Sequence, residues 1–569
     1  MKYKPLPIGI ENFEKLIEQK YYYVDKTLLI QKLLDYKAEV TLFTRPRRFG
    51  KSLNLSMLQC FFEKTEKDRS HLFHGLKIEE AGNEYREHMG KYPVIMLSFK
   101  EAKQDDFSVA YYTICEAIAE EFQRHSQILN LDVMTEKEKE SYTMIMNKAA
   151  EYKVMLSSVK FLTRCLERAY GEKVIVLIDE YDVPLENSHF KGFYNDMIGF
   201  IRGILSAALK TNNALEMAIM TGCLRISKES IFTGLNNPKI VSIENKMYGE
   251  YFGFTEREVA DMLVYYNQQD RQEVITEWYN GYLFGVTKVY NPWSLISYMD
   301  ELQSGEIERP KPYWANTSSN NIVRELLEKS DATTKIELEE LMAGGIIKKQ
   351  IHEDITYADI YASMDNLWNF LYFTGYLKKV SEETKDDTAY AVLQISNKEV
   401  MDIYKNHILG WVTKQIEQAD FTKLYEATLT GDTATMEEEI GRILWETVSY
   451  YDTANSKAGE SFYHGLLVGI YAGLKDYQML SNRESGNGRP DFVIKGPVYK
   501  RKAYIFEFKI AEKPQKLAEA AIEALEQIEE REYKEGLLAE GYEDITVYGV
   551  GFFKKNCRVR TWERATDEK

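Results

Sequence analysis

Hydrophobic residues occur along the chain in short continuous runs, separated by longer stretches with helical spacing. Such runs predict strands at 40–43, 93–99, 173–178 and 215–222, and again near the end of the chain at 490–494, 502–509 and 545–553. Helical spacing covers much of residues 53–92, 107–170, 194–210 and 516–533. Continuous apolar strands that alternate with helices are typical of sheets buried on both faces. The pattern therefore predicts the α/β fold class for both ends of the chain.

A basic turn joins the first predicted strand to the first helix. Residues 45–52 read RPRRFGKS, and a strand, a turn ending in Gly-Lys-Ser and a helix are the layout of a phosphate-binding loop. Backbone N–H groups at a helix N-terminus attract phosphate, Lys51 would reach the β- and γ-phosphates of ATP, and Ser52 would hold Mg²⁺. Arg45 replaces the usual first glycine, so the backbone cradle is altered. The predicted cofactor-binding residues of this loop are Arg47, Arg48, Gly50, Lys51 and Ser52. The simpler alternative is a basic turn before an ordinary helix.

Two later strands end in polar residues that suit the same site. The strand at 173–178 leads into Asp179 and Glu180, and the carboxyl end of a parallel strand is where doubly wound sheets bind ligands. We predict that Asp179 holds Mg²⁺ and that Glu180 polarises the attacking water. Thr221, at the end of the next strand, is a candidate sensor of the γ-phosphate, and Arg225 a candidate phosphate contact. The alternatives are an edge strand with a solvated acidic end and a plain surface arginine.

Length and composition restrict the class of protein. A chain of 569 residues predicts several domains, because single cores stop growing at about 250–300 residues. Its net charge of −17, from 72 basic and 89 acidic residues, argues against a chain that coats nucleic acid non-specifically. The five cysteines are scattered, which is typical of reduced thiols. No signal peptide and no membrane-length apolar run are found, so we expect a cytoplasmic protein that does not bind membranes.

The same patterns divide the chain into four parts. Residues 1–249 are predicted to form a P-loop domain, and residues 250–300 a helical lid that begins with a capping box at Thr255 and Glu258. Residues 301–440 are predicted to be a helical middle region without a chemical motif. Residues 441–569 are predicted to form a second α/β domain.

The second domain carries a further group of charged residues. Asp491 precedes one predicted strand, and Glu507 and Lys509 lie two residues apart on the next, so they share one face. Glu460 lies on a preceding helix, one turn from His464. Two carboxylates beside a lysine suit Mg²⁺-assisted phosphodiester hydrolysis, in which the acids hold the metal and the lysine offsets developing charge. The predicted catalytic residues are Glu460, Asp491, Glu507 and Lys509, with Asp491 and Glu507 as metal ligands. The simpler alternative is a surface Glu/Lys pair on a hairpin.

This ordered set is similar to the PD-(D/E)XK nuclease superfamily, whose signature Pro490-Asp491 and Glu507-Phe508-Lys509 match. The whole chain resembles a bacterial family in which an AAA-type ATPase-like domain precedes a PD-(D/E)XK nuclease-like domain. The residues that carry this resemblance are RPRRFGKS at 45–52, LIDEYD at 177–182, WYNGY at 278–282, YNPW at 290–293, SNRESGNGRPD at 481–491 and IFEFK at 505–509. The resemblance implies ATP binding by the first half and a restriction-endonuclease-like metal site at the end.

Together these observations favour a protein that couples a P-loop ATPase-like domain to Mg²⁺-dependent cleavage of nucleic acid. One alternative is a nucleotide-switched module whose nuclease fold binds nucleic acid without cutting it. Another is a sensor ATPase that acts on a protein partner, which the acidic net charge suits. A homo-oligomer is compatible with either.

Overall fold

The computed structural model divides into two compact units, which we describe separately. The first unit comprises residues 1–318 and 348–402, and the second comprises residues 319–347 and 403–569. The structure describes residues 3–224, 238–305, 309–314, 332–342, 344–352, 363–385, 388–404, 420–447, 463–464, 466–468, 470–471, 473–474, 476–481, 490–497 and 500–562.

A five-stranded parallel sheet forms the centre of the first unit. Its strands follow the order β2-β3-β4-β1-β5, and the four predicted runs supply four of them. Their bounds are β1 Val40–Thr44, β2 Val94–Ser98, β3 Val174–Asp179, β4 Leu215–Gly222 and β5 Lys239–Val241. Every residue of β1 and β3 is buried, as continuous apolar strands require. The parallel pairing places the carboxyl ends of β1, β3 and β4 at one edge of the sheet.

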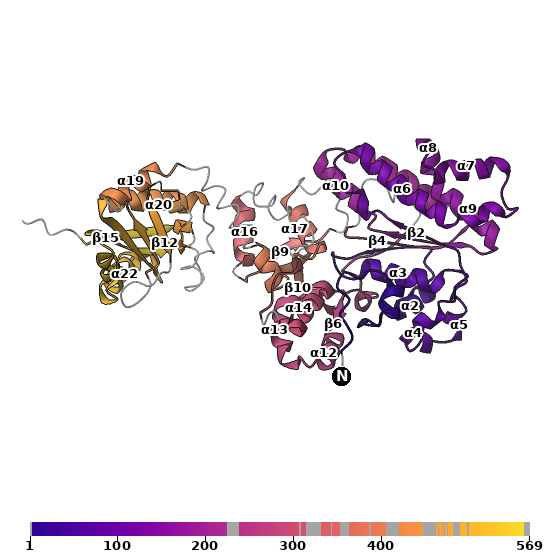
Figure 1. Cartoon of the computed structure of the whole chain (residues 1–569), viewed down its shortest axis with the longest axis horizontal. Coiled ribbons are helices and arrows are strands. Elements are labelled where there is room, and N and C mark those ends of the chain that lie inside the picture. Colours follow the sequence, from indigo (N-terminus) through magenta and orange to yellow (C-terminus); the bar gives the residue numbers. More distant parts are fainter. Residues whose placement is uncertain are drawn as a thin grey trace, which may run out of the picture. The chain divides into compact units, whose positions relative to one another are not determined.

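Helices cover both faces of this sheet (Figure 1). On one face lie α6 (Phe107–Arg124), α7 (Glu136–Met146), α8 (Tyr152–Leu156), α9 (Ser158–Tyr170) and α10 (Val183–Lys191). On the other lie α2 (Leu28–Tyr36), α3 (Lys51–Phe62), α4 (Lys77–Glu80) and α5 (Asn83–Arg86). The remaining helices of this region are α1 (Phe13–Glu18) and α11 (Tyr194–Leu209). The predicted P-loop parallel-sheet fold is confirmed.

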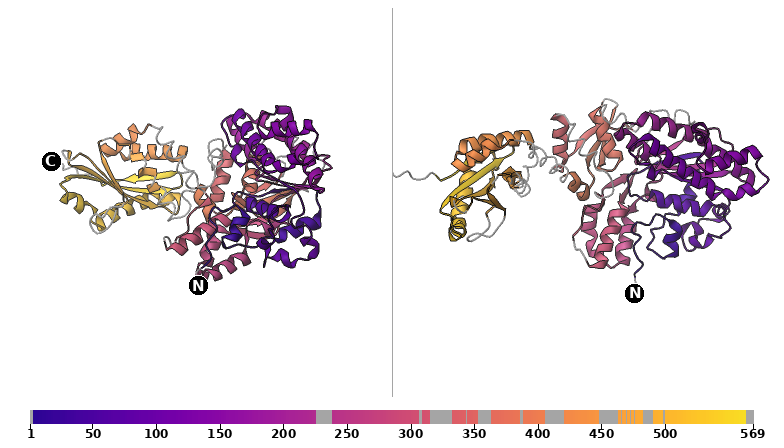
Figure 2. Two further views of the ribbon diagram at one scale, coloured as in Figure 1. Left: turned by 45° about the vertical axis from the view of Figure 1, so that its right-hand side comes forward. Right: turned by 45° about the horizontal axis from the view of Figure 1, so that its top comes forward.

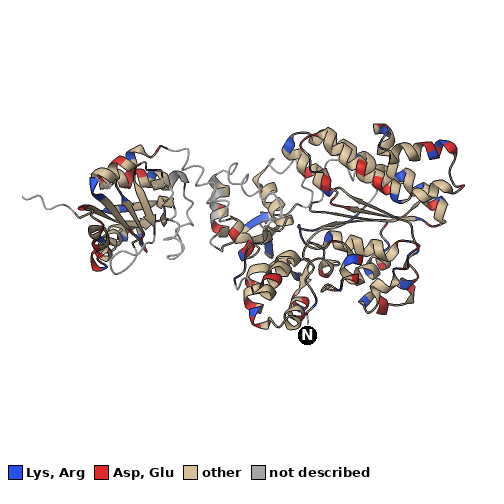
Figure 3. Ribbon diagram, viewed as in Figure 1, with Lys and Arg blue, Asp and Glu red and all other residues tan. Residues whose placement is uncertain are grey.

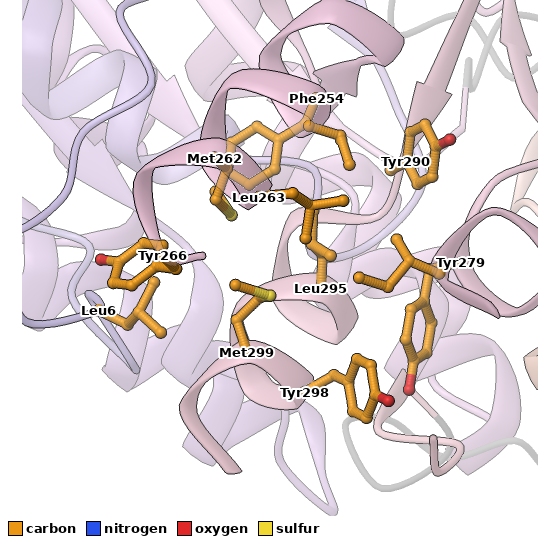
Figure 4. Close-up of a cluster of buried hydrophobic side chains, with 12 residues drawn as sticks. Leu6, Phe254, Met262, Leu263, Tyr266, Tyr279, Tyr290, Leu295, Tyr298 and Met299 are labelled. Carbon is orange, nitrogen blue, oxygen red and sulfur yellow. The ribbon is translucent and has the colours of Figure 1, made fainter. Parts of the chain in front are cut away.

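A small three-stranded sheet and three helices follow, in the segment predicted as a helical lid. The strands are β6 (Phe254–Thr255), β7 (Tyr282–Phe284) and β8 (Thr287–Tyr290), and the helices are α12 (Glu256–Tyr265), α13 (Gln272–Tyr279) and α14 (Pro292–Ser304). Their shared core contains tyrosine, methionine and leucine side chains from all three helices, which converge in Figure 4. Leu6, from the start of the chain, packs into the same core.

An ion pair also ties the start of the chain to this segment. The predicted capping box forms: the Thr255 side chain accepts from the Glu258 N–H and the Glu258 carboxylate accepts from the Thr255 N–H. The same carboxylate accepts hydrogen bonds from the Lys26 ammonium at 2.6 and 2.7 Å. The ammonium also donates to the Glu250 carbonyl at 2.6 Å. Burial lowers the pKa of Lys26, while Glu258 opposes that shift.

The region predicted to be helical, residues 301–440, also contains strands. A sheet of order β10-β11-β9 is formed by β9 (Ile347–Gln350), β10 (Leu377–Lys385) and β11 (Thr388–Ile395), with α17 (Met364–Phe373) beside it. The β10 sequence, LKKVSEETK, is largely charged and lacks an apolar run, so hydrophobic pattern alone does not reveal the strand. Helix α16 (Ala332–Met342), from the same region, belongs to the second unit.

The second unit is built on a mixed five-stranded sheet of order β12-β13-β14-β15-β16. Its elements are α19 (Thr422–Thr430), α20 (Thr433–Thr447), β12 (Gln478–Ser481), β13 (Phe492–Lys495), β14 (Lys502–Ile510), α22 (Leu517–Glu530), α23 (Tyr533–Ala539), β15 (Asp544–Phe553) and β16 (Asn556–Arg560). Helix α22 covers one face of the sheet, and α19 and α20 cover the other (Figures 1 and 2). The predicted C-terminal α/β domain is confirmed.

Acidic and basic residues are intermingled on the helices of both units (Figure 3). Among the described residues, no helix is both long enough and apolar enough to span a bilayer.

One buried carboxyl joins three segments of the first unit. The two carboxylate oxygens of Glu399 each lie 2.9 Å from the Ser294 hydroxyl, and one accepts the Trp314 N–H at 2.8 Å. Glu399 is fully buried, and burial raises its pKa from 4.5 to about 8 despite these donors. The Glu399 side chain is therefore mostly neutral in the folded protein at neutral pH.

This pKa predicts a pH dependence of stability. A carboxyl whose pKa is raised by folding contributes most below its unfolded value of 4.5, and that contribution is lost as pH rises towards about 8. The slope is about 1.4 kcal/mol per pH unit. Glu399→Gln, which stays neutral, should remove this slope. Denaturant titrations of the full chain across this pH range test it, and parallel curves for the two proteins would contradict it.

Candidate functional site

The turn after β1 has the geometry of a phosphate-binding loop at its Gly-Lys-Ser end. Gly50 is the N-cap of α3, with a φ of 78° in the left-handed region that favours glycine. The helix begins at Lys51, so its first N–H groups open onto the loop. The Lys51 ammonium donates to the carbonyls of Arg45 at 3.0 Å and Pro46 at 2.9 Å. This cation therefore lies within the loop, where phosphate oxygens would meet it.

Three predicted residues meet at the carboxyl edge of the sheet. The Ser52 hydroxyl donates to one oxygen of Asp179 at 2.6 Å, and the Thr221 hydroxyl donates to the other. The residues come from α3, β3 and β4, and the pairing of β4 with both β1 and β3 brings their ends together. A carboxylate beside a serine hydroxyl is a hard oxygen donor set, which fits Mg²⁺. The structure thus brings Ser52, Asp179 and Thr221 together, and their roles towards Mg²⁺ and phosphate stay predictions.

Glu180 follows Asp179 in a strained backbone conformation. Its φ is 52°, which a side chain other than glycine rarely adopts, and its N–H donates to the Thr221 hydroxyl at 3.5 Å. Burial raises the pKa of Glu180, and the negative charges of Asp179 and Asp182 act in the same direction, while Lys51 opposes them. A carboxylate with a raised pKa is a stronger proton acceptor than an ordinary one.

Lys100 is a further cation near this edge that the sequence argument missed. It follows β2, the neighbour of β3, and its charge opposes the rise in the pKa of Glu180. Its ammonium also pairs with Glu11 at 3.1 Å. The signal was weak because Lys100 lies in a charged stretch, KEAK, without a motif.

The arginines of the loop have protein partners. Arg45 is fully buried, and its guanidinium donates to the carbonyls of Thr44 at 2.9 Å and Val241 at 2.8 Å. The same guanidinium lies 5.2 Å from the Phe252 ring centre and 5.0 Å from that of Phe284. The substituted first position therefore contacts the sheet and the lid segment.

The two predicted phosphate-contacting arginines also meet protein groups. Arg47 forms an ion pair with Glu186. The Arg48 guanidinium lies over the Trp293 ring, 4.4 Å from its centre, and its φ of 68° is left-handed. A role for Arg47 or Arg48 on a nucleotide stays a prediction. Arg225 lies outside the described residues.

A second group of charged residues forms in the C-terminal unit. Strands β13 and β14 are antiparallel, with Phe492 opposite Phe506, so Asp491 lies beside Glu507. The Asp491 N–H donates to a Glu507 carboxylate oxygen at 3.2 Å. The Phe508 N–H donates to an Asp491 carboxylate oxygen at 2.7 Å. Asp491, directly before β13, and Glu507 of β14 are therefore neighbours in the sheet, as the sequence predicted.

The face of β14 that carries Glu507 and Lys509 is turned towards α22. In the parallel pair with β15, Glu507 lies opposite Gly549 and Lys509 opposite Gly551. A side chain at either glycine would collide with the α22 backbone, since a Cβ would lie 2.1 Å from the Ala521 carbonyl or 2.3 Å from the Leu517 carbonyl. These glycines let α22 approach the sheet closely. Gln527 of α22 then donates to the Glu507 carboxylate.

Gln527 is a second residue that the sequence argument missed. It is a polar position on an amphipathic helix, and such positions usually face solvent. His464, one helical turn after Glu460 in the predicted helix, contacts the Asp491 carbonyl at 2.7 Å. Glu460 itself lies outside the described residues.

Asp491 and Glu507 suit Mg²⁺ better than a metal ion whose ligands must all be protein side chains. Within the described part of the chain, no three His, Cys, Asp or Glu side chains form a metal-binding group. Mg²⁺ is commonly held by one or two carboxylates together with water and substrate phosphate. The donor set therefore fits that ion, and Asp491 and Glu507 would hold it.

Comparison with known proteins finds family matches over the two parts of the chain that contain these residues. Residues 7–232 match the family model described as a predicted AAA-ATPase, and residues 458–562 match that of the PD-(D/E)XK nuclease superfamily. The chain therefore carries an AAA-ATPase-like domain and, towards its C-terminus, a PD-(D/E)XK nuclease-like domain. A protein from Azotobacter chroococcum mcd 1, described as an uncharacterized protein in the vnfD 5'region, is 27% identical over an alignment of 568 residues that covers 98% of each chain.

Proposed function

We propose that the protein binds Mg²⁺·ATP at the loop of residues 45–52 and, under the control of that nucleotide, cleaves phosphodiester bonds of nucleic acid at Asp491 and Glu507. The observation that carries the proposal is a pair of hydrogen bonds, in each of which one of these carboxylates accepts a backbone N–H at or next to the other residue. Glu507 is buried, and two carboxylates held close to each other repel unless a cation lies between them. A bound cation removes that repulsion.

The residues of the first site have separate roles in this proposal. Lys51 binds the β- and γ-phosphates, and Ser52 and Asp179 hold Mg²⁺. Thr221, hydrogen-bonded to Asp179, senses whether the γ-phosphate is present. Glu180 accepts a proton from the attacking water, for which its raised pKa suits it.

The residues of the second site would act on a phosphodiester. A metal held there would polarise the scissile phosphate and lower the pKa of a bound water. Lys509, on the same face as Glu507, offsets the negative charge that develops on the phosphate. Gln527 fixes the orientation of the Glu507 carboxylate through its hydrogen bond.

Nucleotide binding is tested at Lys51. Lys51→Ala removes a charge-assisted contact with phosphate and should weaken the binding of Mg²⁺·ATP by about 1.5–3 kcal/mol. Calorimetric titration of the full chain measures the affinity. Lys15→Ala, an exposed lysine on α1, is the matched control and should bind ATP as the wild type does. Equal affinities for all three proteins would contradict the proposed site.

Cleavage is tested at Asp491. Wild-type protein should cut at least one of plasmid DNA, single-stranded DNA and RNA when Mg²⁺ or Mn²⁺ is present, and ATP should change the rate. Asp491→Asn should abolish cutting, whereas Asp476→Asn, an exposed aspartate of the same unit, should not. Gel assays with and without ATP decide the matter. If the wild type binds these substrates and cuts none of them, the domain is a binding module.

A further inference from the structure

Two aromatic segments of the lid lie against the phosphate-binding loop. The Phe49 ring lies 4.9 Å from that of Tyr282 and 5.1 Å from that of Phe284. The Arg48 guanidinium lies 4.4 Å from the centre of the Trp293 ring. Tyr282 ends the WYNGY motif at 278–282, and Trp293 ends the YNPW motif at 290–293. The proposed chemistry uses neither motif.

The same two segments contact residues 396–399, which follow β11. The Asn397 amide donates to the Asn280 carbonyl at 2.9 Å, and the Ser294 hydroxyl lies 2.9 Å from Glu399. Gly281 has a φ of 106°, and a Cβ there would lie 1.9 Å from the Ser396 carbonyl. Only glycine allows this close approach.

A third contact links the loop directly to the region just before β10. A Cβ on Gly375 would lie 3.1 Å from the Pro46 side chain and 3.2 Å from the Tyr282 ring. The backbone at 375 therefore packs against both the loop and the first aromatic segment. The first structural unit ends at residue 402, three residues after Glu399, and the chain then enters the second unit.

We infer that residues 278–282 and 290–294, here called the connector, transmit nucleotide occupancy of the loop to residues 396–402, where the chain leaves the ATPase-like unit. This inference rests on the proposed nucleotide binding, and it names the residues through which bound nucleotide would act on the chain beyond the loop. Arg48 and Phe49 contact the connector, while the adjoining Gly50, Lys51 and Ser52 face the phosphate site, so a change in the loop on binding must be accommodated by the connector.

Linkage makes this route measurable in both directions. If nucleotide favours one arrangement of residues 396–402, a change that shifts the balance between arrangements must also change nucleotide affinity. A ligand that binds both arrangements equally well does not change the balance between them. Typical couplings of this kind change affinity by about fivefold to a hundredfold.

The variant that tests the connector is Asn397→Asp. It keeps the side-chain acceptor that receives the Val400 N–H at 3.0 Å, but it places an oxygen against the Asn280 carbonyl in place of the amide donor. Ser363→Ala is the matched control. It removes the cap that accepts the Asn366 N–H at 3.1 Å at the start of α17 and leaves the connector intact. Ser294→Ala interrupts the second contact and serves if Asn397→Asp does not fold.

Hydrogen exchange of the full chain, with Mg²⁺ and a non-hydrolysable ATP analogue, gives the readout. In the wild type and in Ser363→Ala, the analogue should slow exchange at residues 45–55 and also at 396–402. In Asn397→Asp, only residues 45–55 should respond, and affinity should change by about fivefold or more. Protection of the loop without any response at 396–402 in the wild type overturns the connector but leaves nucleotide binding standing. No protection of the loop, with no heat of binding, removes both.

Discussion

The buried guanidinium of Arg45 is the constraint on which the first unit depends. It occupies the position where phosphate-binding loops usually have glycine, and it lies between β5 and the rings of Phe252 and Phe284. Burial lowers its pKa to about 9, so the group is still charged at neutral pH. Removing a charge from water is costly, and two carbonyls and two ring faces offset only part of that cost, because the Nε and the second terminal nitrogen are buried without a hydrogen-bond partner among the described residues. The loop is thereby attached to elements about two hundred residues later in the chain.

This attachment separates the loop into two functional ends. Residues 45–49 contact protein: Arg47 pairs with Glu186, and Arg48 and Phe49 pack on aromatic rings. Residues 50–52 keep the left-handed glycine, the cation and the hydroxyl that phosphate and Mg²⁺ require. A loop with several glycines would be more mobile when empty, whereas packing of its first half holds this one in shape. The cost is that any rearrangement of the loop must also move its partners.

The sequence was sufficient wherever chemistry and hydrophobic pattern coincided. Buried parallel strands read as apolar runs, and the acids at their ends fall at one edge by topology, so the meeting of Ser52, Asp179 and Thr221 could be predicted. The neighbouring Asp491 and Glu507 could be predicted for a similar reason, since consecutive antiparallel strands bring them together. The two family models match the parts of the chain in which these residues lie.

What could not be predicted depends on packing between distant segments. The direction of the Arg45 side chain is set by β5 and by two phenylalanines that no local rule connects to it. Gln527 reaches Glu507 only because Gly549 and Gly551 admit α22 closely. Strand β10 is too highly charged to be recognised by its pattern, and Glu399 is buried only once three segments assemble around it.

The affinity of Arg45→Gly for Mg²⁺·ATP tests this account most directly. The substitution restores the glycine that phosphate-binding loops usually carry. If the loop sequence alone decided the affinity, the variant would bind Mg²⁺·ATP as tightly as the wild type or more tightly. Our account predicts weaker binding, because the glycine adds about 0.5–1 kcal/mol of backbone freedom and the contacts with Val241, Phe252 and Phe284 are lost. Calorimetry on the full chain, with Lys15→Ala as the control, measures the difference. An affinity equal to or higher than that of the wild type would contradict the account.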